Sequence, residues 1–192
     1  NGALLQGADF SGAALAGADL TGADLTNADF SGCSAANAVF AAAKGAGALF
    51  PGALLEGASF EKAQLPGVDF ARARLKGAKM AGAVLPKAVL TGAVLEGADL
   101  KEADLSGAAG TGADLRKALL IKAVAPASIW EKATLDGADL SGAKLAKAMF
   151  GGASMKQVNL SAAELQGAMF PKASLQLAKA LRINAFEASF EK

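Results

Sequence analysis

Two Ser-x-x-Lys strings are the clearest candidates for nucleophilic chemistry, because a lysine three residues after a serine can serve as its base. They are Ser59-Phe60-Glu61-Lys62 and Ser189-Phe190-Glu191-Lys192, and neither is accompanied by a second motif. The chain has no histidine, the commonest general base. Its single cysteine, Cys33, stands where alanine is the rule, which indicates a packed thiol rather than an activated one. We therefore expect no catalytic residue and no enzymatic activity.

Carboxylates recur at one position of a repeating pattern and are the candidate metal ligands. They are Asp9, Asp19, Asp24, Asp29, Asp69, Asp99, Asp104, Asp114 and Asp139. Aspartates in turns commonly bond nearby backbone N–H groups instead, and we favour that interpretation. The strings Gly45-Ala46-Gly47 and Gly110-Thr111-Gly112 do not open a helix-forming stretch, which argues against a phosphate-binding loop. No metal, cofactor or small-molecule substrate is expected.

All of these residues lie on a five-residue period that never changes phase. From Leu5 to Phe190, the positions divisible by five (the central positions) are Leu, Phe, Met or Trp in 32 of 38 cases. The positions two residues earlier are Ala in 33 of 38 cases, and residues two apart in extended backbone face the same side. Of the 23 glycines, 20 stand two residues after a central position, and all five prolines stand one residue after it. This pattern predicts inward central side chains joined by type II turns.

A second period of 20 residues predicts how many sides make a coil. The aromatic central residues at this spacing are Phe10, Phe30, Phe50, Phe70, Trp130, Phe150, Phe170 and Phe190. Residues 20 apart should stack, which gives four sides per coil and a rod about 45 Å long at the usual β-ladder spacing. Gly110 interrupts this column next to Trp130, so we expect the indole to fill the volume that the glycine leaves.

The repeats Ala18-Asp19-Leu20-Thr21-Gly22 and Ala98-Asp99-Leu100-Lys101-Glu102 resemble the A(D/N)LxX signature of the pentapeptide-repeat family. The resemblance is strong over residues 1–175 and weak over 176–192. It implies an all-β fold, a right-handed quadrilateral parallel β-helix, here of about nine to ten coils. It also implies frequent dimers through an end of the solenoid and no common catalytic activity.

We expect residues 1–192 to form a single solenoid, with 176–192 as a degenerate coil or a capping segment. Residues 174–183 could instead form a short C-terminal capping helix with Ser174 as its N-cap. Both alternatives are open at this point.

Composition excludes several classes of protein. Lys and Arg number 19 and Asp and Glu 18, so the net charge is +1, which does not favour nucleic acid as a partner. One cysteine excludes an intrachain disulfide. No signal peptide and no apolar run of about 18 residues is visible, so no membrane span is predicted and the compartment is unassigned, cytoplasmic by default.

Outward side chains on the aromatic side of the solenoid become apolar in the second half of the chain. An extended apolar stripe usually marks a contact surface, and methionines are adaptable anchors. The candidate partner surface consists of Leu49, Val89, Ile129, Met149 and Met169, with Arg72, Lys132 and Lys172 at the adjoining corner.

The sequence favours a non-enzymatic interaction rod: a scaffold, docking or oligomerisation module with a protein partner. Long Ala/Gly-rich arrays of this kind resemble repeat regions attached to bacterial secretion-system proteins. The expected homo-oligomer is a dimer through an end of the solenoid. The alternative is a topoisomerase (gyrase) protector of the quinolone-resistance type, which mimics DNA. The near-zero net charge and the absence of any out-of-phase loop argue against that alternative.

Overall fold

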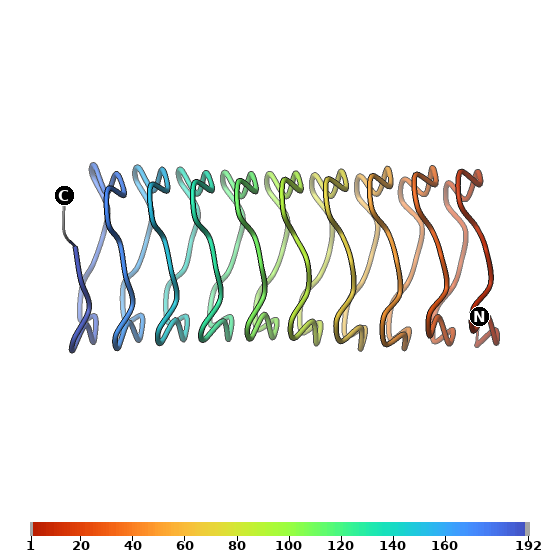
Figure 1. Cartoon of the computed structure of the whole chain (residues 1–192), viewed down its shortest axis with the longest axis horizontal. Coiled ribbons are helices and arrows are strands. Elements are labelled where there is room, and N and C mark those ends of the chain that lie inside the picture. The colour runs from red at the N-terminus through yellow and green to blue at the C-terminus, as the bar shows by residue number, and fades with distance from the viewer. Residues whose placement is uncertain (1, 191–192) are drawn as a thin grey trace.

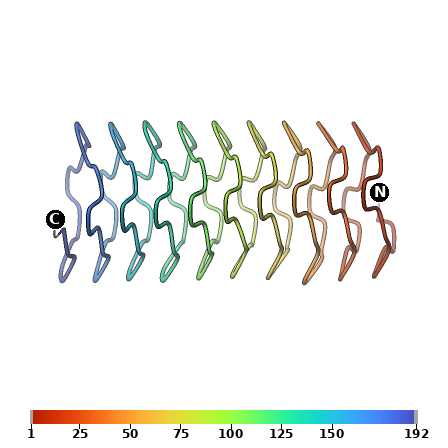
Figure 2. The ribbon, with the colours of Figure 1, turned by 45° about the horizontal axis from the view of Figure 1, so that its top comes forward.

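The computed structural model describes residues 2–190, which wind into a straight rod with the two termini at opposite ends (Figure 1). Within this part of the chain there is no helix and no strand longer than a single residue. Parallel bridges instead join the residue before each central position to the residue 20 later, from Leu4↔Asp24 to Met169↔Ser189. Each coil therefore contains 20 residues on four sides, and successive coils stack in register along the whole rod (Figure 2).

Each side of a coil ends in a tight turn. In all but two of the described turns, the N–H three residues after a central residue donates to the carbonyl of that central residue, as Ala8 N does to Leu5 O at 3.0 Å. The second corner residue of every turn, two after the central position, has a positive φ: 61–68° in 20 glycines and 53–60° in 18 other residues. A positive φ at this position is the mark of the type II turn, so the predicted turn chemistry is confirmed.

The N–H of the first corner residue, one after the central position, does not enter the backbone ladder of residues 2–190. In the nine repeats that carry aspartate before the central position, the carboxylate accepts a bond from this N–H. Asp9 does so from Ser11 N at 2.8 Å, for example. Proline removes the donor at its five positions, and no proline repeat carries aspartate. The aspartates are therefore turn-stabilising residues, as the sequence suggested.

The interior is filled by two aromatic columns from opposite sides of the coil. Phe30 and Phe50 stack with ring centroids 4.7 Å apart, and Phe40 and Phe60 stack at 4.8 Å on the opposite side. Rings from the two columns meet edge-to-face at 5.3–5.7 Å, a favoured aromatic geometry. The prediction that residues 20 apart stack is confirmed.

Trp130 occupies the space beside Gly110, as expected. A Cβ added to Gly110 would stand 2.2 Å from Trp130 Cζ3, so only glycine fits there. The indole N–H donates to Ser128 Oγ at 2.7 Å, and the Ser128 hydroxyl donates to the Ala125 carbonyl at 2.6 Å. Ser128 is fully buried yet satisfied, because the indole and this carbonyl supply its partners.

The predicted capping helix over residues 174–183 is wrong. These residues continue the coil, with bridges Ser154↔Ser174 and Asn159↔Lys179 and with a positive φ at Leu177. The side chains of Leu175 and Ile183 pack against the core of the preceding coil. Lys179 N also bonds the Val158 carbonyl at 2.8 Å. A helix would lose this packing and these coil-to-coil bonds, so the repeat register prevails over local helix propensity.

Candidate partner surface

The apolar column is defined by Leu49, Val89, Ile129, Met149 and Met169. All five lie in one bridge series, Leu49↔Asp69↔Val89↔Ala109↔Ile129↔Met149↔Met169, so they form a single line along the rod. Their side chains point outward between two corners and are half-buried to exposed, with Met169 40% exposed. This alignment agrees with the 20-residue period of the sequence, and its use as a contact surface stays a prediction.

Proline and cations border the apolar column on both sides. All five prolines of the chain lie at its two corners: Pro51 and Pro171 at one, Pro66, Pro86 and Pro126 at the other. Arg72, Lys132 and Lys172 stand at the first of these corners, where the sequence placed them. Lys87 and Lys147 stand at the opposite corner; they were not among the predicted surface residues, although their place in the 20-residue period could have revealed them.

These five flanking cations all sit at the second corner position with positive φ: 57° at Arg72, 59° at Lys87, 55° at Lys132, 59° at Lys147 and 58° at Lys172. This conformation costs a non-glycine residue about 1 kcal/mol or more. The stems of Arg72, Lys87, Lys132 and Lys147 reach toward the next coil, where glycine leaves room. The Cγ of Lys147, for example, lies 3.6 Å from where a Cβ on Gly167 would stand. The charged ends project from the corners beside the apolar column.

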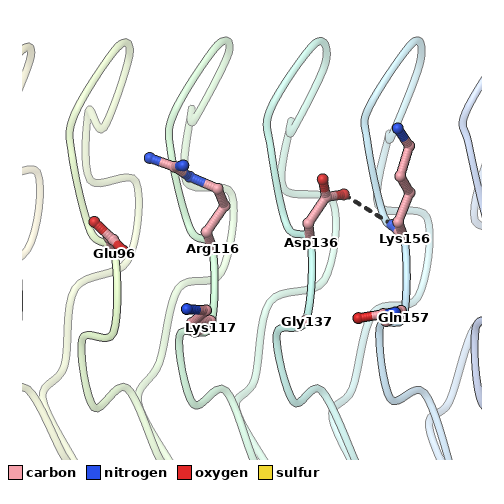
Figure 3. A pocket seen from close by; sticks show the side chains of 7 residues that line it. All are labelled: Glu96, Arg116, Lys117, Asp136, Gly137, Lys156 and Gln157. Carbon is pink, nitrogen blue, oxygen red and sulfur yellow. Dashed lines mark hydrogen bonds between the residues drawn. The ribbon is translucent and has the colours of Figure 1, made fainter.

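On the other sides of the rod, four cations of residues 2–190 form ion pairs with carboxylates. A shallow hollow on a different corner is lined by Glu96, Arg116, Asp136, Lys156 and three neighbours (Figure 3). Arg116 Nη2 lies 2.6 Å from Asp114 Oδ2, and this carboxylate raises the pKa of Arg116 while the guanidinium lowers the pKa of Asp114. Asp136 accepts bonds from Ser154 Oγ at 2.7 Å and from Lys156 N at 2.9 Å.

Lys76 in the same series bonds Glu96 at 3.0 Å and lowers the pKa of that carboxyl group. Glu96 and Arg116 are therefore paired with residues beside the hollow, whereas Lys117 and Lys156 form no ion pair within residues 2–190.

The candidate catalytic groups do not assemble into a site. The Ser59 hydroxyl donates to Glu61 at 3.3 Å and makes no bond with Lys62, the lysine of its motif. The second Ser-x-x-Lys string ends at Glu191 and Lys192, which lie outside the described residues. Cys33 is fully buried, and desolvation raises the pKa of its thiol to about 11, which disfavours the reactive thiolate.

Residues 2–190 contain no cluster of three or more His, Cys, Asp or Glu side chains that could hold a metal ion. Over the same range, the structure has no helix long and apolar enough to cross a membrane.

The last described coil breaks the surface pattern at its corners. Leu177, Leu181 and Phe186 are 79%, 73% and 70% exposed at corner positions that other coils mostly give to small or polar residues. Phe190 at the adjoining end of the aromatic column stacks on Phe170 at 4.8 Å and is itself half-exposed. This cluster was not predicted from the sequence, because a capping helix over residues 174–183 was one of the two alternatives there.

Fold and surface together define a four-sided β-solenoid of five-residue repeats that offers side chains for contact rather than a catalytic centre. A family model described as "Pentapeptide repeats" matches in eight copies, over residues 3–40, 36–70, 69–107, 111–148, 131–161 and 138–176. The chain belongs to the pentapeptide-repeat family and is a right-handed, quadrilateral β-helix. Proteins of this family are generally non-enzymatic structural or interaction proteins.

Solved structures of this fold cover most of the chain. QnrB1, a plasmid-mediated fluoroquinolone resistance protein, matches in a trypsin-treated variant with TM-score 0.56 and 21% identity over 93% of this chain and 89% of that one. Its full-length form gives 0.54 and 20% over 93% and 92%. HetL from the cyanobacterium Nostoc sp. strain PCC 7120, involved in heterocyst differentiation regulation, gives 0.45 and 26% over 97% and 87%. No curated protein sequence matches.

Proposed function

We propose that the chain is a non-enzymatic protein-interaction rod that docks a partner protein along the apolar column. The observation that carries this proposal is the outward apolar run from Val89 through Ala109, Ile129 and Met149 to Met169, which is unbroken over five coils. Ile129 and Met149 are adjacent in it, and prolines fix the backbone on both sides. Prolines at the bordering corners restrict the backbone before binding. Less conformational entropy is then lost when a partner binds, which favours association.

Crosslinking from defined positions tests this role. A photoreactive benzoylphenylalanine at Ile129 should crosslink one specific protein in cells that naturally produce the chain. The matched control is Leu119, which has the same outward position on another side of the rod and is likewise half-buried. Equal crosslinking from both positions, or none from Ile129, would contradict the proposed docking face.

We also propose a homodimer through the last described coil rather than through the apolar column. Leu177, Leu181 and Phe186 place large apolar side chains at three corners of that coil. Symmetric pairing of two such coils covers these side chains, and two-fold dimers are the commonest homo-oligomers.

The gyrase-protector alternative finds less support. The likeness to QnrB1 is one of fold alone, at 20–21% identity. A mimic of DNA should be strongly acidic, whereas this chain carries a net charge of +1 and cations beside its apolar column. A gyrase supercoiling assay with a fluoroquinolone tests the alternative, and rescue at micromolar protein would reverse our ranking.

A further inference from the structure

The flanking cations stand along borders that offer almost no carboxylate partner. Of residues 2–190, four cations form ion pairs, and all four lie away from the apolar column: Arg74, Lys76, Lys101 and Arg116. None of Arg72, Lys87, Lys132, Lys147 and Lys172 makes an ion pair within that range. Glu131 is the one acid at these two corners or in this column between residues 70 and 176. The borders of the apolar column thus carry uncompensated positive charge on both sides.

The backbone of this side limits what can lie on it. Ile129 N bonds the Ala108 carbonyl of the preceding coil, and Trp130 N bonds the Met149 carbonyl of the next. The same pairing repeats along the column, so an extended peptide laid on this side would find no free ladder of donors and acceptors. An α-helix satisfies its own backbone and needs only side-chain contacts.

The dimensions of the apolar column also suit a helix. Val89 and Met169 are four coils apart, which is about 19 Å at the usual ladder spacing. A helix of about 13 residues covers this length, and its rise per turn of about 5.4 Å is close to one coil. The column has no aromatic side chain, so it lacks the stacking platform that single-stranded nucleic acid uses.

We propose that the apolar column receives an amphipathic α-helix of a partner protein whose apolar stripe is flanked on both sides by Asp or Glu. This inference rests on the proposed docking function and adds the chemistry of the partner. The carboxylates pair with Lys87 and Lys147 on one border and with Arg72, Lys132 and Lys172 on the other. The apolar stripe packs on Val89, Ile129, Met149 and Met169. Charges of the same sign on both borders reject basic helices.

A synthetic peptide provides the direct test with the full chain. The probe is an 18-residue, fluorescein-labelled helix with Leu at positions 3, 7, 10 and 14, Glu on both flanks of this stripe and Lys on the far side. Its control carries Gln in place of the flanking Glu. Fluorescence anisotropy should show binding of the Glu peptide with a Kd below about 100 μM, weakened by salt, and binding of the Gln peptide at least tenfold weaker.

Matched variants of the rod locate the contact. Lys132→Glu/Lys147→Glu should weaken binding at least tenfold. Lys117→Glu/Lys122→Glu should leave it unchanged, because these lysines share the positive φ and the contact with the next glycine but stand on other corners. Ile129→Ser should likewise weaken binding, and Leu119→Ser should not.

Absence of peptide binding, equal binding of the Gln peptide, or equal effects of the two lysine pairs would each overturn the helix proposal. Binding to phosphatidylglycerol vesicles in place of the peptide would overturn it in favour of a membrane surface. If the Ile129 crosslink is found while the peptide fails, the docking face stands and only the acidic-helix chemistry is wrong. If both fail, the docking function itself is wrong.

Discussion

Gly110→Ala should be among the most damaging single-atom additions in this chain. An added Cβ would stand 2.2 Å from Trp130 Cζ3 and 2.3 Å from Cε3, far inside the normal carbon contact of about 3.5–4.0 Å. The φ of Gly110 is not positive, so alanine brings no backbone strain and the effect is one of packing alone.

The magnitude follows from how little the indole can move. Its N–H is held by Ser128, and the ring is only 2% exposed within the packed interior. Overpacking of this kind costs typically about 1–3 kcal/mol, and we expect the upper end, about 3 kcal/mol. Trp130→Leu should relieve the clash, so the double variant Gly110→Ala/Trp130→Leu should be more stable than the two single effects predict, by about 1 kcal/mol or more.

Urea unfolding followed by circular dichroism measures these differences, and the emission of the single tryptophan reports on its burial. Gly151→Ala is the matched control, because its φ is not positive either and its added Cβ would meet only ordinary contacts at 3.6–3.9 Å. We expect that control to be neutral or slightly stabilising. Equal stability of the Gly110 and Gly151 variants, or fully additive effects with Trp130→Leu, would refute the packing argument.

Three further predictions follow from burial and charge. Phe70→Ala removes a ring that stacks on Phe50 at 5.2 Å and should cost about 3–5 kcal/mol, whereas the outward Asp69→Ala should cost about 1 kcal/mol or less; similar urea midpoints would contradict the inward assignment. Cys33, with a thiol pKa of about 11, should resist a disulfide reagent at pH 7 until urea unfolds the chain, and rapid labelling of the native protein would show that it is not buried. Hydrogen bonds from Ser11, Thr21 and Thr26 lower the pKa of Asp9, Asp19 and Asp24, so their stabilisation is present above the ordinary aspartate value and is lost as pH falls through the lowered values. The unfolding midpoint should therefore be steady from pH 7 to about pH 5 and fall below about pH 4, and a midpoint that rises in acid would argue against it.

Most of the fold was predictable because every repeat combines a large inward residue, a small inward residue and a tight turn. Large central residues and the alanines two before them recur every five residues, so both can point into one interior only if each side of the coil contains five residues. The 20-residue spacing of the aromatic residues then predicts that Phe30 stacks on Phe50. The place of Trp130 beside Gly110 was predictable for the same reason, since a missing side chain and an oversized one are neighbours in that column. Its bond to Ser128 was not, because it depends on how the indole is turned inside the coil.

The predictions failed where the five-residue repeat is weak, and they were incomplete where ion pairs between side chains determine which charges stay free. Residues 174–183 have local helix propensity, and only contacts with the preceding coil hold them in the repeat register. The candidate surface was predicted on one border alone, and Lys87 and Lys147 complete the other. Which cations are paired could not be predicted, because Arg74 and Lys76 reach carboxylates on neighbouring coils through particular side-chain conformations.

Sedimentation velocity tests most directly the claim that this molecule works by association, and it separates the two proposed contacts. A concentration of about 100 μM is well above the micromolar range of modest interfaces. The wild type should sediment as a dimer, and so should Met149→Lys/Met169→Lys, because the apolar column is reserved for a different partner. Leu181→Glu/Phe186→Glu should be monomeric, since it places charge on the exposed apolar corners of the last described coil. A charged residue at Leu5, in the first coil, should leave the dimer intact. A monomeric wild type would contradict the account, and loss of the dimer in the methionine pair alone would reverse the two assignments.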